Sequence, residues 1–403
     1  MNPSAPGWIK KHLAYFLASN PHLHSGEDAY YDQLRDAGFI YGASVKTLAD
    51  EQRAQLEWTE EEKTKVNLLD ALVFTYYDTI ANPKLADCVQ AINGFYAKLS
   101  KRSNSFLKFP RRQLKPEEKL ERILNARIQT NESLLQKNFS NLITNALLFV
   151  DVLAFDHQLL TGESPLPYAT RLESTLTSVI WLALQQKQEK DDYDELLIRL
   201  FEGSLRYSKA LNTQSQELAS LDLQSYALLQ ERRYIFDLAC LAVHNDGELD
   251  RMESKFLKQL AKELYLKPEM AQSSNQAVNH FIKAHIDDIS YLNYSNPLNH
   301  FYGQMSRTTR VLIMRNKKRL LVELSESKDL VLLLGQSTIR ELNAQEKRLV
   351  RNQLLDICKS IPSLAIFILP GGGILLPLLV KLIPQLLPSA FNENRSDEDV
   401  KTF

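Results

Sequence analysis

Glycine is scarce in this chain. Only 13 of its 403 residues are glycine, where average usage would give roughly 28. Runs of β-branched residues are also few, whereas Leu, Ala, Lys, Glu and Gln are abundant. This balance favours helices over strands and tight turns. We therefore predict an all-α protein.

Cysteine and excess charge are lacking too. Cys88, Cys240 and Cys358 are far apart and odd in number, which argues against a disulfide framework or a zinc site and fits a reducing compartment. The formal net charge of -1 gives no general attraction to nucleic acid, so we expect no DNA partner. The N-terminus has no apolar stretch typical of a signal peptide and lacks the arginines of a mitochondrial presequence. We expect the bulk of the chain to remain in the cytoplasm.

Motifs of the common enzyme classes are absent from the sequence. It contains no P-loop, Rossmann glycine fingerprint, HExxH zinc helix or GxSxG elbow. Asp156 and His157 are adjacent, but no nucleophile motif accompanies them, so we interpret His157 as structural. We predict that the protein is not an enzyme.

A basic segment lies between Lys101 and Pro116 and contains no acidic residue. One interpretation is a solvated linker before a helix that Pro116 opens. The alternative is a patch on an anionic membrane, where Phe106 and Phe109 would suit the interface.

An acidic turn separates two helical patterns in the stretch from Ile235 to Leu266. Asp250 and Glu253 have the spacing of a capping box, which predicts a capped turn between helices. The alternative is a cation site, for which the candidate ligands are Asp246, Glu248, Asp250 and Glu253. In an EF-hand frame, positions one and three would be Ala242 and His244, where calcium needs oxygen donors.

The same turn, Asp-Gly-Glu-x-Asp-x-x-Glu between two helices, resembles the core of tellurite-resistance TerB-like domains. These are small helical bundles whose acidic residues are suspected of binding metal. The resemblance implies a divalent metal at the four acidic residues named above, and we expect no other cofactor.

Near the C-terminus, 21 residues from Ser360 to Val380 carry no charge. About 20 apolar residues suffice to cross a bilayer. Prolines and Gly371–Gly373 interrupt the run, so a kinked span, a re-entrant or interfacial hairpin and a soluble core hairpin stay open.

A capping box at Asn343 and Glu346 predicts a helix before the run. The cations of that helix precede the run and an acidic tail follows it, which places the N-terminal mass in the cytoplasm.

This region resembles the leucine-zipper/EF-hand-containing transmembrane (LETM) family. The matching residues are Asp356, Pro362, Pro370, Leu376, Pro377, Lys381, Leu382, Pro384, Leu387, Pro388, Ser389 and Phe391. The resemblance implies an inner-membrane protein linked to cation/proton exchange and volume control and, in mitochondria, to ribosome contact. Phe403 lies twelve residues after Phe391, and three glycines replace the usual bulkier residues, so we expect ribosome contact not to carry over.

Two functions follow as expectations. The first is a membrane-anchored, short bacterial-type LETM-like protein acting in cation/proton homeostasis. Asp356 and Lys381 are the ionisable candidates in its membrane segment, so transport would need a homo-oligomer or another subunit. We expect Lys381 to snorkel to the headgroups rather than to move ions. The alternative is a non-transporting scaffold that binds a protein partner, the ribosome among them, or a metal.

The predicted organisation is a multi-helical cytoplasmic bundle with a C-terminal Pro/Gly-broken membrane segment at the inner (cytoplasmic) membrane. Its parts are an N-terminal helical region with the basic linker (1–115), a helical region (116–225), a TerB-like helical region (226–300), a LETM-like membrane-anchoring region (305–391) and a polar tail (392–403).

Overall fold

The computed structural model describes most of the chain up to Ser360. The described residues are 2–19, 26–48, 58–99, 114–128, 145–186, 217–243, 250–285, 313, 316, 320, 322–324, 327–336, 340 and 342–360. They form helices and turns, with no β-strand among them. The predicted all-α class is therefore confirmed for this part of the chain.

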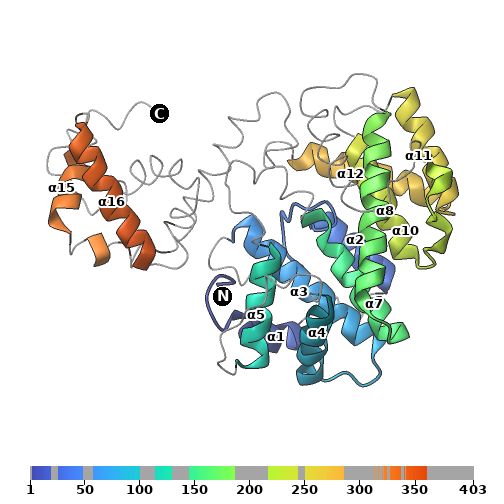
Figure 1. Cartoon of the computed structure of the whole chain (residues 1–403), viewed down its shortest axis with the longest axis horizontal. Coiled ribbons are helices and arrows are strands. Elements are labelled where there is room, and N and C mark those ends of the chain that lie inside the picture. Colours follow the sequence, from blue (N-terminus) through green and yellow to red (C-terminus); the bar gives the residue numbers. More distant parts are fainter. Residues whose placement is uncertain are drawn as a thin grey trace. The chain divides into compact units, whose positions relative to one another are not determined.

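The chain divides into two compact units, and the first comprises residues 1–55, 60–130 and 139–295. Figure 1 shows α10, α11 and α12 together at one end of this unit, with α1, α4 and α5 at the other. Its helices are α1 (Trp8–Ser19), α2 (Glu27–Asp36), α3 (Glu60–Thr79), α4 (Leu85–Leu99), α5 (Pro116–Ile128), α7 (Leu148–Thr161), α8 (Pro165–Gln185), α10 (Leu229–Val243), α11 (Arg251–Glu263) and α12 (Pro268–His285). Two short 3-10 turns, η4 (Leu218–Ser220) and η5 (Leu223–Ser225), precede α10.

Helix α3 is the centre of this unit. It packs against α4, α5 and α7, and every side chain from Thr64 to Tyr76 is buried. The polar ones among them have internal partners: Asp70 pairs with His12 of α1, and Asn67 donates to the Lys46 carbonyl at 3.0 Å. Buried polar groups need such partners because an unpaired one loses its hydrogen bonds to water. Leu69, Leu72, Val73 and Tyr76 recur at three- and four-residue spacing, which is the apolar pattern of a helix.

A tight turn after α2 is buried in the core, with Phe39, Ile40 and Tyr41 fully inaccessible. Gly38 and Gly42 bracket it with φ values of 79° and 78°, in the left-handed region that favours glycine. A Cβ on Gly38 would lie 2.0 Å from the Ala43 carbonyl oxygen and 2.8 Å from the Phe281 ring. The turn therefore requires glycine at this position, and we did not predict it from the sequence.

The break between α7 and α8 is short. Gly162, Pro165 and Pro167 follow one another closely in the sequence, yet α7 ends at Thr161 and α8 begins at Pro165. Gly162 ends α7 in a left-handed conformation with φ 74°. Proline is tolerated in the first turn of a helix, where the backbone N–H would have no intrahelical partner, so α8 can start at Pro165.

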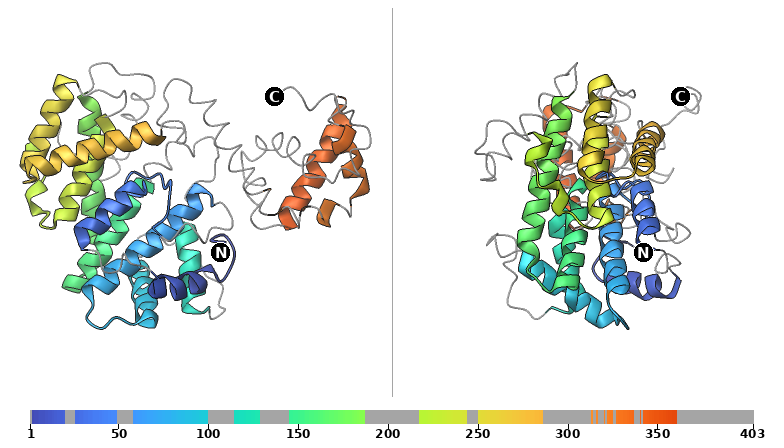
Figure 2. Two further views of the ribbon diagram at one scale, coloured as in Figure 1. Left: turned by 180° about the vertical axis from the view of Figure 1, so that it is seen from behind. Right: turned by 90° about the vertical axis from the view of Figure 1, so that its right-hand side faces the viewer.

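Helices from different predicted regions share this core. Helix α1 packs on α5, α3 packs on α7, and α8 packs on α10. Figure 2 shows these helices from behind and from the side. The boundaries predicted at residues 116 and 226 both fall inside the first compact unit. That they separate domains stays a prediction.

The second unit comprises residues 56–59, 131–138 and 296–403. Its main described helices are α15 (Lys328–Gln336) and α16 (Ala344–Ser360), which pack against each other. Leu330 and Leu334 on α15 are buried, as are Val350 and Leu354 on α16. Apolar residues at three- and four-residue spacing therefore form one seam between the two helices.

Candidate functional site

Arg340 holds the corner between α15 and α16. Its Nη1 and Nη2 atoms donate to the two Glu346 carboxylate oxygens, each at 2.8 Å, and Nη2 also donates to Gln336 Oε1 at 2.6 Å. This two-pronged geometry matches a guanidinium to a carboxylate. Arg340 thereby ties the last residue of α15 to the first turn of α16. This contact was not predicted, because Arg340 and Glu346 are six residues apart in sequence and no short motif links them.

The predicted capping box at the start of α16 is confirmed. Asn343 Oδ1 accepts from the Glu346 N–H at 2.9 Å, and Glu346 Oε2 accepts from the Asn343 N–H at 2.9 Å. The hydrogen bond from Arg340 and then that from the Asn343 backbone lower the pKa of Glu346 to about 2. Glu346 is therefore a carboxylate at neutral pH, as the clamp with Arg340 requires.

The outer surface of α16 is charged. Lys347, Arg348 and Arg351 are exposed, and so is Asp356, the first residue of the predicted LETM-like motif. No Asp or Glu lies three or four residues from any of the three cations along α16. Arg348 and Arg351 therefore have no acidic residue at the usual intrahelical ion-pair spacing.

The other predicted membrane-motif residues lie outside the described part of the chain. These are Pro362, Pro370, Pro377, Lys381, Pro384 and Pro388. Within the residues that the structure describes, no helix combines the length and the apolar character needed to cross a bilayer.

The acidic turn before α11 is described in part. Asp250 Oδ1 accepts from the Met252 and Glu253 N–H groups at 2.6 and 2.8 Å, and Glu253 Oε2 accepts from the Asp250 N–H at 2.9 Å. The predicted capping box is confirmed, and it employs two of the four candidate metal ligands. Asp246 and Glu248 lie outside the described residues, so metal binding stays a prediction. The described side chains include no group of three His, Cys, Asp or Glu arranged to hold a metal.

Asp156 and His157 face different partners. Asp156 accepts from the Thr79 hydroxyl at 3.2 Å. His157 stacks on Tyr168, with ring centroids 4.5 Å apart, and its Nε2 lies 3.5 Å from Glu163. The two neighbours thus contribute to two separate contacts of α7.

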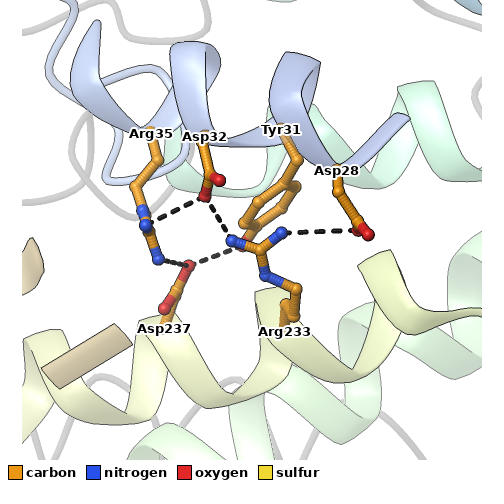
Figure 3. A network of polar contacts seen from close by, with 6 residues as sticks. All are labelled: Asp28, Tyr31, Asp32, Arg35, Arg233 and Asp237. Carbon is orange, nitrogen blue, oxygen red and sulfur yellow. Dashed lines mark hydrogen bonds and ion pairs between the residues drawn. The ribbon is translucent and has the colours of Figure 1, made fainter. Parts of the chain in front are cut away.

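A buried polar network joins α2 to α10, as Figure 3 shows. The Tyr31 hydroxyl donates to Asp237 Oδ2 at 2.7 Å. The Arg35 guanidinium lies 3.8 Å from the same oxygen and 2.9 Å from Asp32. Burial raises the pKa of Asp237, while Arg35 and the hydrogen bonds from Ser274 and Tyr31 oppose the rise. The contacts of Asp237 with α2 and with Ser274 of α12 therefore favour its ionised form against the effect of burial.

Arg233 completes this network from α10. Its guanidinium pairs with Asp32, lies 3.5 Å from Asp28 and sits 4.4 Å above the centre of the Tyr31 ring. A cation over an aromatic ring is attracted by the negative face of the ring. About 200 residues of sequence separate the two sides of the network, so no local pattern could have predicted it.

Three carboxyl groups converge beside this network. Glu27 of α2, Asp78 of α3 and Asp156 of α7 line a cavity of about 20 Å³, which has room for roughly one water. Burial, followed by the charge of Asp78, raises the pKa of Glu27. Burial also raises the pKa of Asp156, against the hydrogen bond from Thr79. Chemically, the cluster can retain a proton better than isolated carboxyls do.

Comparison with known proteins identifies one segment. Residues 342–402 match the family model described as LETM1-like, RBD. This segment is LETM-like. The match begins just before α16, includes the uncharged run and covers less than a fifth of the chain. No curated protein and no solved structure matches the chain. The resemblance of residues 226–300 to TerB-like domains stays a prediction.

Proposed function

We propose that this chain is a membrane-anchored helical protein of the LETM-like group that acts in cation/proton homeostasis. The observation that carries the proposal is the LETM-like match over residues 342–402. That segment contains the 21 uncharged residues whose length suits a bilayer. The proposal assigns the protein no enzymatic reaction.

The charge pattern supports the orientation. Exposed cations on α16 come before the uncharged run, and an acidic tail follows it. Because short segments rich in Lys and Arg stay on the cytoplasmic side, the bulk of the chain lies in the cytoplasm at the inner membrane. Asp356 and Lys381 are the ionisable motif residues near the two ends of the run. Transport would thus require a homo-oligomer or a further membrane subunit.

The test is ion flux in proteoliposomes that contain the purified full-length protein. The proposal predicts a cation-dependent proton flux above that of empty liposomes. Lys381→Gln separates the two roles of that residue: unchanged flux fits a snorkelling lysine, whereas a several-fold loss at equal incorporation places it on the ion path. Lys255→Gln, at an exposed position of α11, is the matched control for loss of one charge.

The second candidate is a membrane-tethered scaffold that binds a protein partner. It is favoured by the description of the matching model as RBD, together with the implied ribosome contact of mitochondrial LETM members. A metal at the TerB-like turn would be a further ligand of this scaffold. Absence of flux, combined with co-sedimentation of the protein with ribosomes, would favour the scaffold over the exchanger.

A further inference from the structure

We infer that the cationic face of α16, formed by Lys347, Arg348 and Arg351, docks on anionic lipid headgroups. The inference rests on the proposed function, since it takes residues after α16 to be in a membrane. It adds a surface and a lipid class that the family match does not assign.

The geometry places the three cations on one side of the helix. At about 100° per residue, Lys347, Arg348 and Arg351 fall within an arc of roughly 100°. The centre of this arc lies roughly 100° around the helix from the centre of the buried seam of Val350, Leu354 and Ile357, so the exposed cations flank the seam on one side. Leu355, half-buried, lies within the same arc. A cationic surface with an apolar side chain among its charges suits the boundary between water and lipid.

Position along the chain favours lipid as the partner. The uncharged run begins at Ser360, nine residues after Arg351, which is about 13 Å along the helix axis. Cations so close to a membrane segment experience the negative potential of an anionic leaflet. The chain as a whole has a formal net charge of -1, so any preference for anionic surfaces must arise locally.

The experiment measures flotation of the full-length protein with two kinds of vesicle. One is phosphatidylcholine alone, and the other is an equal mixture of phosphatidylcholine and phosphatidylglycerol. We expect tighter binding to the mixture, with a difference that shrinks as salt increases. Arg348→Gln/Arg351→Gln should weaken binding to the mixture by roughly 30-fold, from the usual contribution of two cations, and leave binding to phosphatidylcholine unchanged.

Two controls separate charge from folding. Lys255→Gln/Lys258→Gln removes the same charge from exposed positions of α11 and should bind like the wild type. Arg348→Lys/Arg351→Lys keeps the charge and should retain the preference for the mixture. A loss in this lysine variant equal to that in the glutamine variant would overturn the inference.

The remaining outcomes are also decisive. Equal binding of the wild type to both vesicles overturns the inference but leaves membrane anchoring intact. Failure to float with either vesicle overturns the anchoring proposed above and the inference with it. If the glutamine variant floats normally but no longer co-sediments with ribosomes, the face belongs to that partner and the inference is wrong.

Discussion

The first unit and the α15–α16 pair stabilise charged side chains in opposite ways. In the first unit, several charges are buried and paired: Asp151 accepts from Arg127 at 2.6 Å and from the Tyr96 hydroxyl at 3.0 Å. In α15–α16, the described charges lie outside an apolar seam, and Arg340 and Glu346 form the clamp at the corner. The clamp of the α15–α16 pair joins residues six apart in sequence, whereas the buried network of the first unit joins Tyr31 to Asp237, about 200 residues apart.

This difference predicts unequal responses to mutation. Removing one partner of a buried charge pair leaves the other charge without compensation, which is strongly destabilising. An exposed ion pair is screened by water and contributes little. Changes in the core of the first unit should therefore have larger effects than changes at the α15–α16 corner.

The largest effect is expected from Gly38→Ala. The added Cβ would overlap the Ala43 carbonyl oxygen, and φ would remain in a region unfavourable for alanine. We expect the free energy of unfolding to fall by about 3 kcal/mol or more, as measured by urea denaturation. The matched control is Gly94→Ala in α4, where a Cβ meets nothing within 4 Å and should stabilise by about 0.5–1 kcal/mol. Equal stability of the two variants would contradict the structure of the buried turn.

Tyr31→Phe should have the next largest effect. It removes the donor to Asp237 while the carboxyl group remains buried. We expect a loss of about 1.5–3 kcal/mol in the same denaturation experiment, the usual range for a hydrogen bond to a charged group. Tyr265→Phe, at a side chain that is 61% exposed, should leave stability unchanged. If Tyr31→Phe left the free energy of unfolding unchanged, the network would contribute nothing to the packing of α2.

Asp156→Asn tests the carboxyl cluster through pH. Because the folded protein raises the pKa of Asp156 above its ordinary value of 3.8, the native state binds this proton more tightly than the unfolded chain. The contribution of this group to stability is therefore highest below pH 3.8 and falls as pH rises through the raised pKa. Above pH 3.8 the stability of the variant should therefore rise relative to that of the wild type as pH increases. The control is Asp36→Asn at an exposed position of α2, which should show the same dependence of stability on pH as the wild type. The same result for Asp156→Asn would mean that the cluster is fully hydrated and would contradict the prediction.

The smallest effect is expected from Arg340→Lys. Lysine keeps the charge but cannot form the two-pronged contact with Glu346. Amide hydrogens of α16 should exchange a few-fold faster, while those of α3 exchange at the wild-type rate. Unchanged exchange in α16 would mean that the apolar seam alone fixes the corner.

Local features of the fold were predictable from the sequence. The capping residues Asn343, Glu346, Asp250 and Glu253 act within one helical turn, so their spacing alone revealed them. Pro116 marked the start of α5 for the same reason. Apolar periodicity and capping motifs depend only on residues close together in the sequence, so they can be recognised without the structure.

Features built from distant residues were not predictable. Tyr31 and Asp237 come together only because α2 packs on α10, and Glu27, Asp78 and Asp156 come from three helices. The turn at Gly38 is buried because α12 covers it, which no pattern near Gly38 reveals. The candidate site at Lys381 and the prolines around it lies beyond the described residues, so its roles stay predictions.

Membrane anchoring by residues 361–388 is the central claim, and carbonate extraction of membranes tests it most directly. Full-length protein should remain in the membrane pellet, whereas a chain that ends at Ser360 should appear in the soluble fraction with its helical circular dichroism preserved. Full-length protein that carbonate releases, or that is monodisperse in buffer without detergent, would contradict the account.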